Sequence, residues 1–249
     1  MGISREEVEH VARLARLELG EEELERYRRA GTDVAAALRE TLASLRPDVR
    51  EHDVAAALAG QAHARGFTTP VVLAAGDERQ RVHRHPLPTS VRLGRHALLA
   101  VTAEREGLCV SMTRLVSFGP PPGELARLVR AVAEVDAAYL AASRPGATLG
   151  EVFAAGAAAY ADQGFPEEWR GHHQGGLAGY RGREVFAVPG ERTRIPRAAA
   201  LAWNPSIKGG AKSEDTILVT AAGVEVVTRT PDLGELETAG PPRPAIVQL

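Results

Sequence analysis

Two stretches of the chain carry the same pattern: TDVAAALRETLASLRPDVREHDVAAALAGQAHARGF at residues 32–67 and RAVAEVDAAYLAASRPGATLGEVFAAGAAAYADQGF at residues 130–165. Twelve of their 36 aligned positions are identical without a gap, including an Arg-Pro and a Gly-Phe pair: Arg46-Pro47 with Arg144-Pro145, and Gly66-Phe67 with Gly164-Phe165. Proline interrupts a helix, and glycine readily takes the left-handed conformation that ends one. Each copy therefore predicts a helix, a break and a second helix, and the chain is expected to be an internal duplicate.

An apolar hairpin follows each predicted helix pair. The first runs through residues 97–100, a turn at Gly107 and residues 108–118; the second runs through residues 199–204, a turn at 208–211 and residues 215–219. Before them, residues 6–45 are charged and rich in Ala and Leu at helical spacing, which predicts one or two amphipathic helices.

These elements predict one α+β domain over residues 1–249, with a curved sheet covered by helices. We expect a first half at 22–118, a second half at 119–230 and a proline-rich, irregular tail at 231–249. Ligand sites of such duplicates tend to lie where the halves meet.

Composition excludes several classes of protein. The 30 Lys and Arg residues against 32 Asp and Glu leave a net charge of -2, which gives no reason to expect a nucleic-acid or membrane partner. A charged N-terminus, no long apolar run and the single Cys109 favour a cytoplasmic protein without disulfides. We expect Cys109 to be a small buried hydrophobic residue, although a thiol among histidines could also be a nucleophile.

Five short motifs follow one another in the chain: HRHPLP at 83–88, GLCVSMTR at 107–114, HHQGGLAGY at 172–180, WNP at 203–205 and SEDTIL at 213–218. Together with the duplication, they resemble the pita-bread fold of creatinase, methionine aminopeptidase and the proline-specific aminopeptidases and dipeptidases, over about residues 22–230. The resemblance implies that fold, a homodimer and a small-molecule or short-peptide substrate. Many such relatives carry a further N-terminal domain, and the resemblance leads us to expect the catalytic domain alone at this length.

The family peptidases hold two metal ions with two Asp, one His and two Glu. Matched residue by residue, these ligands fall on Ala100, Ser111, His173, Asn204 and Glu214. Only the histidine and one carboxylate remain, which is too little negative charge for a tight two-metal site. The resemblance therefore implies no metal cofactor here, with a reassigned Mn, Zn or Co site as the alternative.

Creatinase uses the same fold without metal, with a histidine as proton shuttle. By that resemblance, His85 or His173 is the general acid/base, because imidazole titrates near neutral pH. Glu214 then orients a cationic substrate or an attacking water. The remaining candidates are expected to bind substrate: His83, His172, Tyr180, Ser111, Asn204 and Trp203. The competing interpretation is that the histidines are hydrogen-bonded loop residues and that Glu214 is a solvated strand-end carboxylate.

Three functions follow from this pattern. The first is a hydrolase of an amide, peptide or guanidino substrate that works without the two-metal centre. The second is a catalytically silent protein that binds a ligand in the same cleft. The third is a metal-dependent Xaa-Pro aminopeptidase or dipeptidase with a reassigned metal site.

Overall fold

The computed structural model describes residues 18–249, and the part of the predicted N-terminal helix at 6–17 lies outside them. The first half consists of α2 (Glu21–Ala43), α3 (Glu51–His63), β1 (Thr68–Gly76), α4 (Asp77–Val82), β2 (His96–Arg105) and β3 (Leu108–Ser117). The Arg-Pro break separates α2 from α3, and Gly66 follows α3 with a φ of +80°.

The second half repeats the helix pair and the later hairpin, with additional short strands. It contains α5 (Gly123–Ala142), α6 (Leu149–Asp162), the short η1 (Glu168–Gly171), β4 (Gly175–Ala178), β5 (Val185–Phe186), β6 (Ala199–Trp203), β7 (Ser206–Ile207), β8 (Ala211–Lys212), β9 (Asp215–Thr220) and β10 (Gly223–Val226). Gly164 follows α6 with a φ of +85°, as Gly66 follows α3. The repeated helix pair and its glycine stops are therefore as the sequence predicted.

Each half contributes one sheet whose own strands are antiparallel. The strand order is β1-β2-β3 in the first, extended beyond β3 by the parallel β13 (Val247–Gln248), and β10-β9-β6-β4-β5 in the second. Both predicted hairpins, β2 with β3 and β6 with β9, are present. The sheets meet where Thr113 of β3 forms a bridge with Glu214, one residue before β9.

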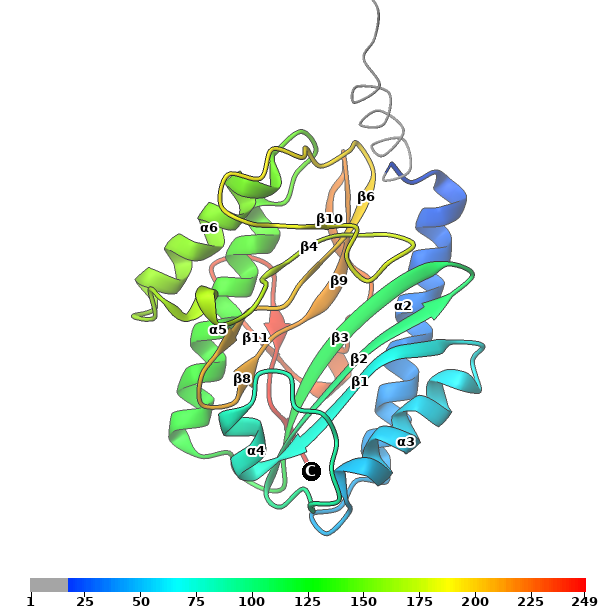
Figure 1. Ribbon diagram of the computed structural model, residues 1–249, viewed down its shortest axis with the longest axis vertical. Helices are drawn as coiled ribbons and strands as arrows, with labels where there is room; N and C mark the ends of the chain where they lie inside the picture. The colour runs from blue at the N-terminus through cyan, green and yellow to red at the C-terminus, as the bar shows by residue number, and fades with distance from the viewer. Residues whose placement is uncertain (1–17) are drawn as a thin grey trace, which may run out of the picture.

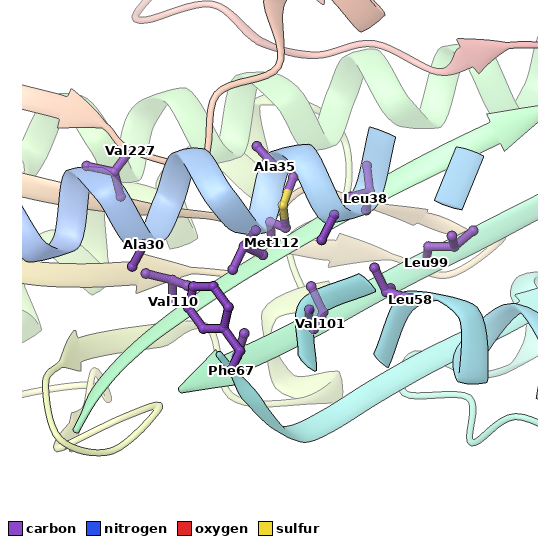
Figure 2. Packing of buried hydrophobic residues seen from close by; sticks show 14 of the residues in the cluster. Ala30, Ala35, Leu38, Leu58, Phe67, Leu99, Val101, Val110, Met112 and Val227 are labelled. Atoms are coloured by element: carbon purple, nitrogen blue, oxygen red, sulfur yellow. The ribbon is translucent and has the colours of Figure 1, made fainter. Parts of the chain in front are cut away.

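The two sheets lie between two helix pairs, with α2 and α3 on one side and α5 and α6 on the other (Figure 1). Because strand residues alternate between faces, Leu98 and Leu115 belong to the cluster of buried residues under α5 and α6. Leu99 and Val110 belong to the opposite cluster, under α2 and α3, which also contains Leu38 of α2 (Figure 2). The strands thus separate two hydrophobic cores.

Glycine permits close contact between α5 and α6. A Cβ at Gly156 would lie 2.0 Å from Cζ of Tyr139, whereas a Cβ at Gly60 in α3 would meet nothing within 4 Å. We expect Gly156→Ala to lower the free energy of unfolding by about 1–3 kcal/mol through overpacking. Gly60→Ala is the matched control and should raise it by about 0.4–1 kcal/mol. Urea unfolding of both variants measures this, and equal shifts would contradict the packing argument.

Residues 231–249, which the sequence predicts to be irregular, contain η2 (Pro231–Leu233), β11 (Glu235–Leu236), β12 (Arg243–Pro244) and β13 (Val247–Gln248). β11 pairs with β12, and β13 lies parallel to β3 at the edge of the first sheet. Arg243 is 1% exposed: its Nε lies 2.8 Å from Asp136 Oδ2, and its Nη2 lies 2.6 Å from Asp215 Oδ2. This segment is thereby tied to both α5 and β9.

Among residues 18–249, none of the helices combines the length and the hydropathy that a transmembrane span requires.

Candidate functional site

A cavity of about 260 Å³ lies where the two halves meet. Pro70, Val71 and Leu73 of β1 contribute to its apolar wall, together with Phe186 of β5. Its polar lining side chains are His85, Thr102, His173, Arg183, Asn204, Lys212 and Glu214. The sequence singles out four of these residues, namely His85, His173, Asn204 and Glu214, and the fold brings all four to one cavity.

Glu214 lies at the junction of the sheets, and each of its oxygens contacts a cation. Oε1 is 3.2 Å from Arg183 Nη2, Oε2 is 3.7 Å from Lys212 Nζ, and Thr113 donates a hydrogen bond of 2.7 Å to Oε2. Burial by itself would raise the pKa of Glu214, but Lys212, Arg183 and Thr113 outweigh it, and the pKa is lowered. Glu214 is therefore ionised at neutral pH.

Arg183 and Lys212 also line the cavity, but they are not among the site residues predicted from the sequence. Their side chains are 7% and 3% exposed, although both carry charge. Burial lowers the pKa of Lys212, and the neighbouring Glu214 opposes that shift. Lys212 could have been predicted from its position in the sequence. It precedes Glu214 by two positions in an extended segment, which directs both side chains to the same face. Arg183 lies in an Arg-rich loop between β4 and β5, where nothing distinguishes it from Arg181.

His85 lies in the loop between α4 and β2, which Glu51 of α3 holds in place. Glu51 is fully buried, and its Oε2 accepts hydrogen bonds from the backbone N and the Oγ1 of Thr89, at 2.9 and 2.6 Å. The same carboxylate pairs with Arg79 at 3.0 Å. The ring of His85 reaches the cavity, with Nε2 3.4 Å from Lys212 Nζ.

Three imidazole rings lie together at the cavity. The ring centroids of His85 and His172 are 5.2 Å apart, and those of His85 and His173 are 6.0 Å apart. Loss of solvation, with Lys212 nearby, lowers the pKa of His85 to about 4. Loss of solvation, with Arg183 nearby, also lowers the pKa of His173 to about 4. Burial lowers the pKa of His172 to about 2. All three rings are thus neutral at pH 7.

His172 has no ring nitrogen left for a ligand. Its Nδ1 lies 2.5 Å from the carbonyl oxygen of His173, so that nitrogen carries the proton and donates. Its Nε2 then accepts from Ser206 Oγ at 2.6 Å, and Ser206 Oγ in turn accepts from Arg84 Nη1 at 2.8 Å. The ring is fixed in one tautomer and serves the structure of the loop.

His173 differs from its neighbour. Within residues 18–249 neither of its ring nitrogens has a hydrogen bond, and the ring packs edge-on against Phe186 with centroids 4.8 Å apart. It lies just before β4 and lines the cavity. Of the three rings, His173 is the one with both nitrogens available to a bound molecule.

Asn204 and Trp203 are adjacent in the chain, but the side chain of Asn204 lines the cavity and that of Trp203 lies in the core. Asn204 is 2% exposed and lines the cavity, and its Oδ1 has no hydrogen-bond partner in the described part of the chain. Trp203 lies in the core, stacked on Tyr139 with centroids 4.6 Å apart, and its Nε1 donates to Ser143 Oγ at 3.0 Å. The tryptophan therefore supports the cavity from behind and does not line it.

The other candidates lie around the cavity rather than in it. Ser111 Oγ is 2.9 Å from Thr102 Oγ1, and Thr102 is a lining residue. Tyr180 is 46% exposed and donates to Glu23 Oε1 of α2 at 3.1 Å, whereas His83 is exposed and does not line the cavity. Cys109 is buried, and burial raises the pKa of its thiol to about 11, which makes it a poor nucleophile.

The described residues do not form a ligand set for a metal ion. Over residues 18–249 there is no group of three or more His, Cys, Asp or Glu side chains arranged to hold a metal ion.

Comparison with known proteins gives consistent matches. Residues 25–221 match the family model described as metallopeptidase family M24. Among curated proteins, the agropine synthesis cyclase of Rhizobium rhizogenes is 34% identical over 138 residues, covering 53% of this chain and 34% of that protein. An uncharacterised peptidase of Staphylococcus aureus strain MW2 is 26% identical over 168 residues, covering 65% of this chain and 47% of that protein. The chain thus spans between a third and a half of these relatives.

Solved structures agree over almost the whole chain. An Xaa-Pro dipeptidase from Bacillus anthracis superposes with a TM-score of 0.82 at 21% identity, covering 96% of this chain and 66% of that one. A dipeptidase from Mycobacterium ulcerans superposes with a TM-score of 0.82 at 24% identity, covering 96% of this chain and 64% of that one. The prolidase from Pyrococcus horikoshii superposes with a TM-score of 0.80 at 20% identity, covering 90% of this chain and 66% of that one. At these identities the matches establish the shared fold.

Proposed function

Because the chain belongs to metallopeptidase family M24 and has its α+β pita-bread fold, as the sequence predicted, we propose that it hydrolyses an amide-type bond without a metal ion. The substrate is a small molecule or a short peptide. The observation that carries the proposal is His173, a neutral imidazole on a cavity beside the ion-paired Glu214, with two ring nitrogens that make no hydrogen bond within residues 18–249.

The five positions of the family ligands do not fit two metal ions in this chain. Ala100 has no ligand atom, and Ser111 and Asn204 offer only neutral oxygens. Both oxygens of Glu214 already contact cationic groups, which would repel a divalent ion placed beside them. A tight two-metal site for Mn, Zn or Co needs more negative charge than one carboxylate provides.

The chemistry assigned to the histidines balances without a metal. His173 takes a proton from a water molecule, and the water oxygen forms a bond to the carbonyl carbon while the carbon–nitrogen bond breaks. The proton then goes to the leaving nitrogen. His85 lies next to the Lys212 ammonium and is placed to relay that proton, and Glu214 keeps the ammonium in position.

A second candidate is supported by one comparison. The relative with 34% identity is named a cyclase, not a peptidase. In a ring closure the same base would activate a hydroxyl group of the substrate in place of water. The two reactions differ in their products, because hydrolysis adds one water to the substrate and ring closure by condensation removes one.

A panel of small amides, short peptides and Xaa-Pro dipeptides, followed by mass spectrometry, tests the proposal. We expect two fragments, an acid and an amine, whose masses add up to that of the substrate plus one water, formed at the same rate with or without a chelator. Turnover that a chelator abolishes and Mn, Zn or Co restores would support the metal-dependent peptidase instead. A product that has lost one water would favour the cyclase, and ligands that raise the melting temperature without any product would favour a silent binding protein.

The assembly belongs to the same proposal. A homodimer of a single domain spanning residues 1–249 is what the family resemblance implies, and light scattering of the purified chain measures it. A monomer at micromolar concentration would contradict it.

A further inference from the structure

Lys212 carries a cation whose hydrogen bonds the protein leaves incomplete. Its side chain lines the cavity and is 3% exposed. An ammonium group has three N–H donors, but within residues 18–249 it makes one hydrogen bond, to His85 Nε2 at 3.4 Å. Glu214 Oε2 lies 3.7 Å away, which is an ion-pair distance longer than a hydrogen bond. His85 and Glu214 also line the cavity, so the ammonium lies between two lining side chains with donors left for a bound molecule.

Arg183, the other cation that lines the cavity, is already used by the protein. Its Nη1 donates to the carbonyl oxygen of Gly182 at 2.5 Å, and its Nη2 contacts Glu214 Oε1 at 3.2 Å. Its Nε is enclosed by protein atoms. Of the two cations, Lys212 is therefore the one placed to donate to a molecule in the cavity.

The proposed hydrolysis places negative charge on the carbonyl oxygen of the substrate. When the water oxygen bonds to the carbonyl carbon, the electron pair of the π bond moves to that oxygen. His173 takes the water proton in this step, and the carboxylate of Glu214 would repel the new charge. A cationic N–H donor held in a buried cavity stabilises such an oxyanion strongly, because it is already in place when the charge forms.

We infer that Lys212 is a further catalytic residue of the proposed hydrolysis, whose ammonium group donates a hydrogen bond to the carbonyl oxygen as that oxygen becomes negative. The inference rests on the proposed function. When the carbon–nitrogen bond breaks, the electron pair returns from the oxygen and restores the carbonyl group. The leaving nitrogen receives the proton that came from water, so Lys212 keeps its protons throughout. His85 and Glu214 hold the ammonium in position.

Steady-state kinetics of Lys212→Met, on the substrate found in the panel, tests the inference. We expect kcat to fall by about 10²–10³-fold, the usual loss for one oxyanion donor, with little change in KM. Glu214 keeps its ion pair with Arg183 and its hydrogen bond from Thr113, so the replacement leaves no unpaired carboxylate. Lys208→Met is the matched control and should leave kcat unchanged. Lys208 is the only other lysine of the sequence, is exposed and does not line this cavity.

Chemical rescue separates a catalytic ammonium group from a side chain that only fills space. In Lys212→Ala, methylammonium ions should raise kcat by about tenfold or more, whereas ethanol, which is similar in size and uncharged, should not. If circular dichroism shows that Lys212→Met does not fold, Lys212→Gln takes its place with the same expected loss. An unchanged kcat would overturn the inference, as would rescue by neither compound or equal rescue by both.

A calorimetric titration without turnover keeps this inference separate from the proposed function. Methylphosphonate places negative oxygens tetrahedrally around phosphorus, as the intermediate does around carbon, whereas acetamide is planar and neutral. We expect Lys212→Met to bind methylphosphonate about tenfold more weakly than the wild-type chain, or worse, with acetamide binding and Lys208→Met unaffected. That result without hydrolysis of any amide would mean that the proposed function fails and that Lys212 still recognises an oxyanion. Hydrolysis at the wild-type rate in Lys212→Met would mean that the proposed function holds and this inference fails.

Discussion

Replacement of His173 by alanine is expected to lower kcat for hydrolysis by about 10²–10⁴-fold, the usual contribution of a general base. The change should leave the fold intact, because the ring makes no hydrogen bond within residues 18–249 and the residue is exposed. Steady-state kinetics on the substrate found in the panel measures the loss. The free energy of unfolding, measured in urea, should change by less than about 0.5 kcal/mol.

The pH profile gives a second readout of the same residue. Loss of solvation lowers the pKa of His173 to about 4, so the neutral ring that acts as base forms as the pH rises through about 4. The rate of the wild-type chain should therefore rise through that pH and stay constant toward neutral pH. In His173→Gln the part of this limb that comes from residue 173 should disappear, because the amide does not titrate, and only the titration of His85, whose pKa is also lowered to about 4, remains.

A histidine away from the cavity provides the control. His63 lies exposed at the end of α3, and His63→Ala should leave kcat unchanged. Turnover in His173→Ala equal to that of the wild-type chain would remove this histidine from the mechanism.

Replacement of Arg243 by methionine is expected to lower the free energy of unfolding by about 3–5 kcal/mol. Methionine has a similar length, but it leaves Asp136, at 0% exposure, without its ion-pair partner, whereas Asp215, at 1% exposure, keeps its pair with Arg114 at 2.9 Å. Removing one partner of a buried ion pair costs more than the pair contributes, because the remaining charge stays desolvated. Urea or thermal unfolding measures the loss.

Arg229 offers the matched comparison from the same stretch of chain. It pairs with Glu235 at 2.6 Å, but its side chain is 52% exposed. Arg229→Met should therefore cost no more than about 1 kcal/mol, as exposed ion pairs do. Similar losses in the two variants would show that the buried network contributes no more than a surface pair.

The repeated features of the fold could be predicted from the sequence, and the unrepeated ones could not. Gly66 and Gly164 mark the ends of the two helix pairs because both need a positive φ, which glycine adopts at little cost. β1 was not predicted, since only its second part is buried and its residues show no polar and apolar alternation. The role of Arg243 was hidden as well, because its partner Asp136 lies 107 positions away.

The candidate site could be predicted only in part, for reasons of local geometry. The resemblance pointed to Asn204 and Glu214, which line the cavity, and also to Trp203, which does not. Neighbouring residues in an extended segment point to opposite faces, so Asn204 and Trp203 could not both reach it. Arg183 was missed because a loop has no periodicity from which the direction of a side chain can be read.

The position of β13 has a consequence for the order in which the protein matures during synthesis. Val247 and Gln248 complete the sheet whose other strands lie between Thr68 and Ser117, so that sheet stays open at one edge until the ribosome has added about 130 further residues. An open strand edge is a template for pairing with other chains. The nascent first half therefore exposes this edge during that interval, and slowing translation of residues 119–246 should increase aggregation.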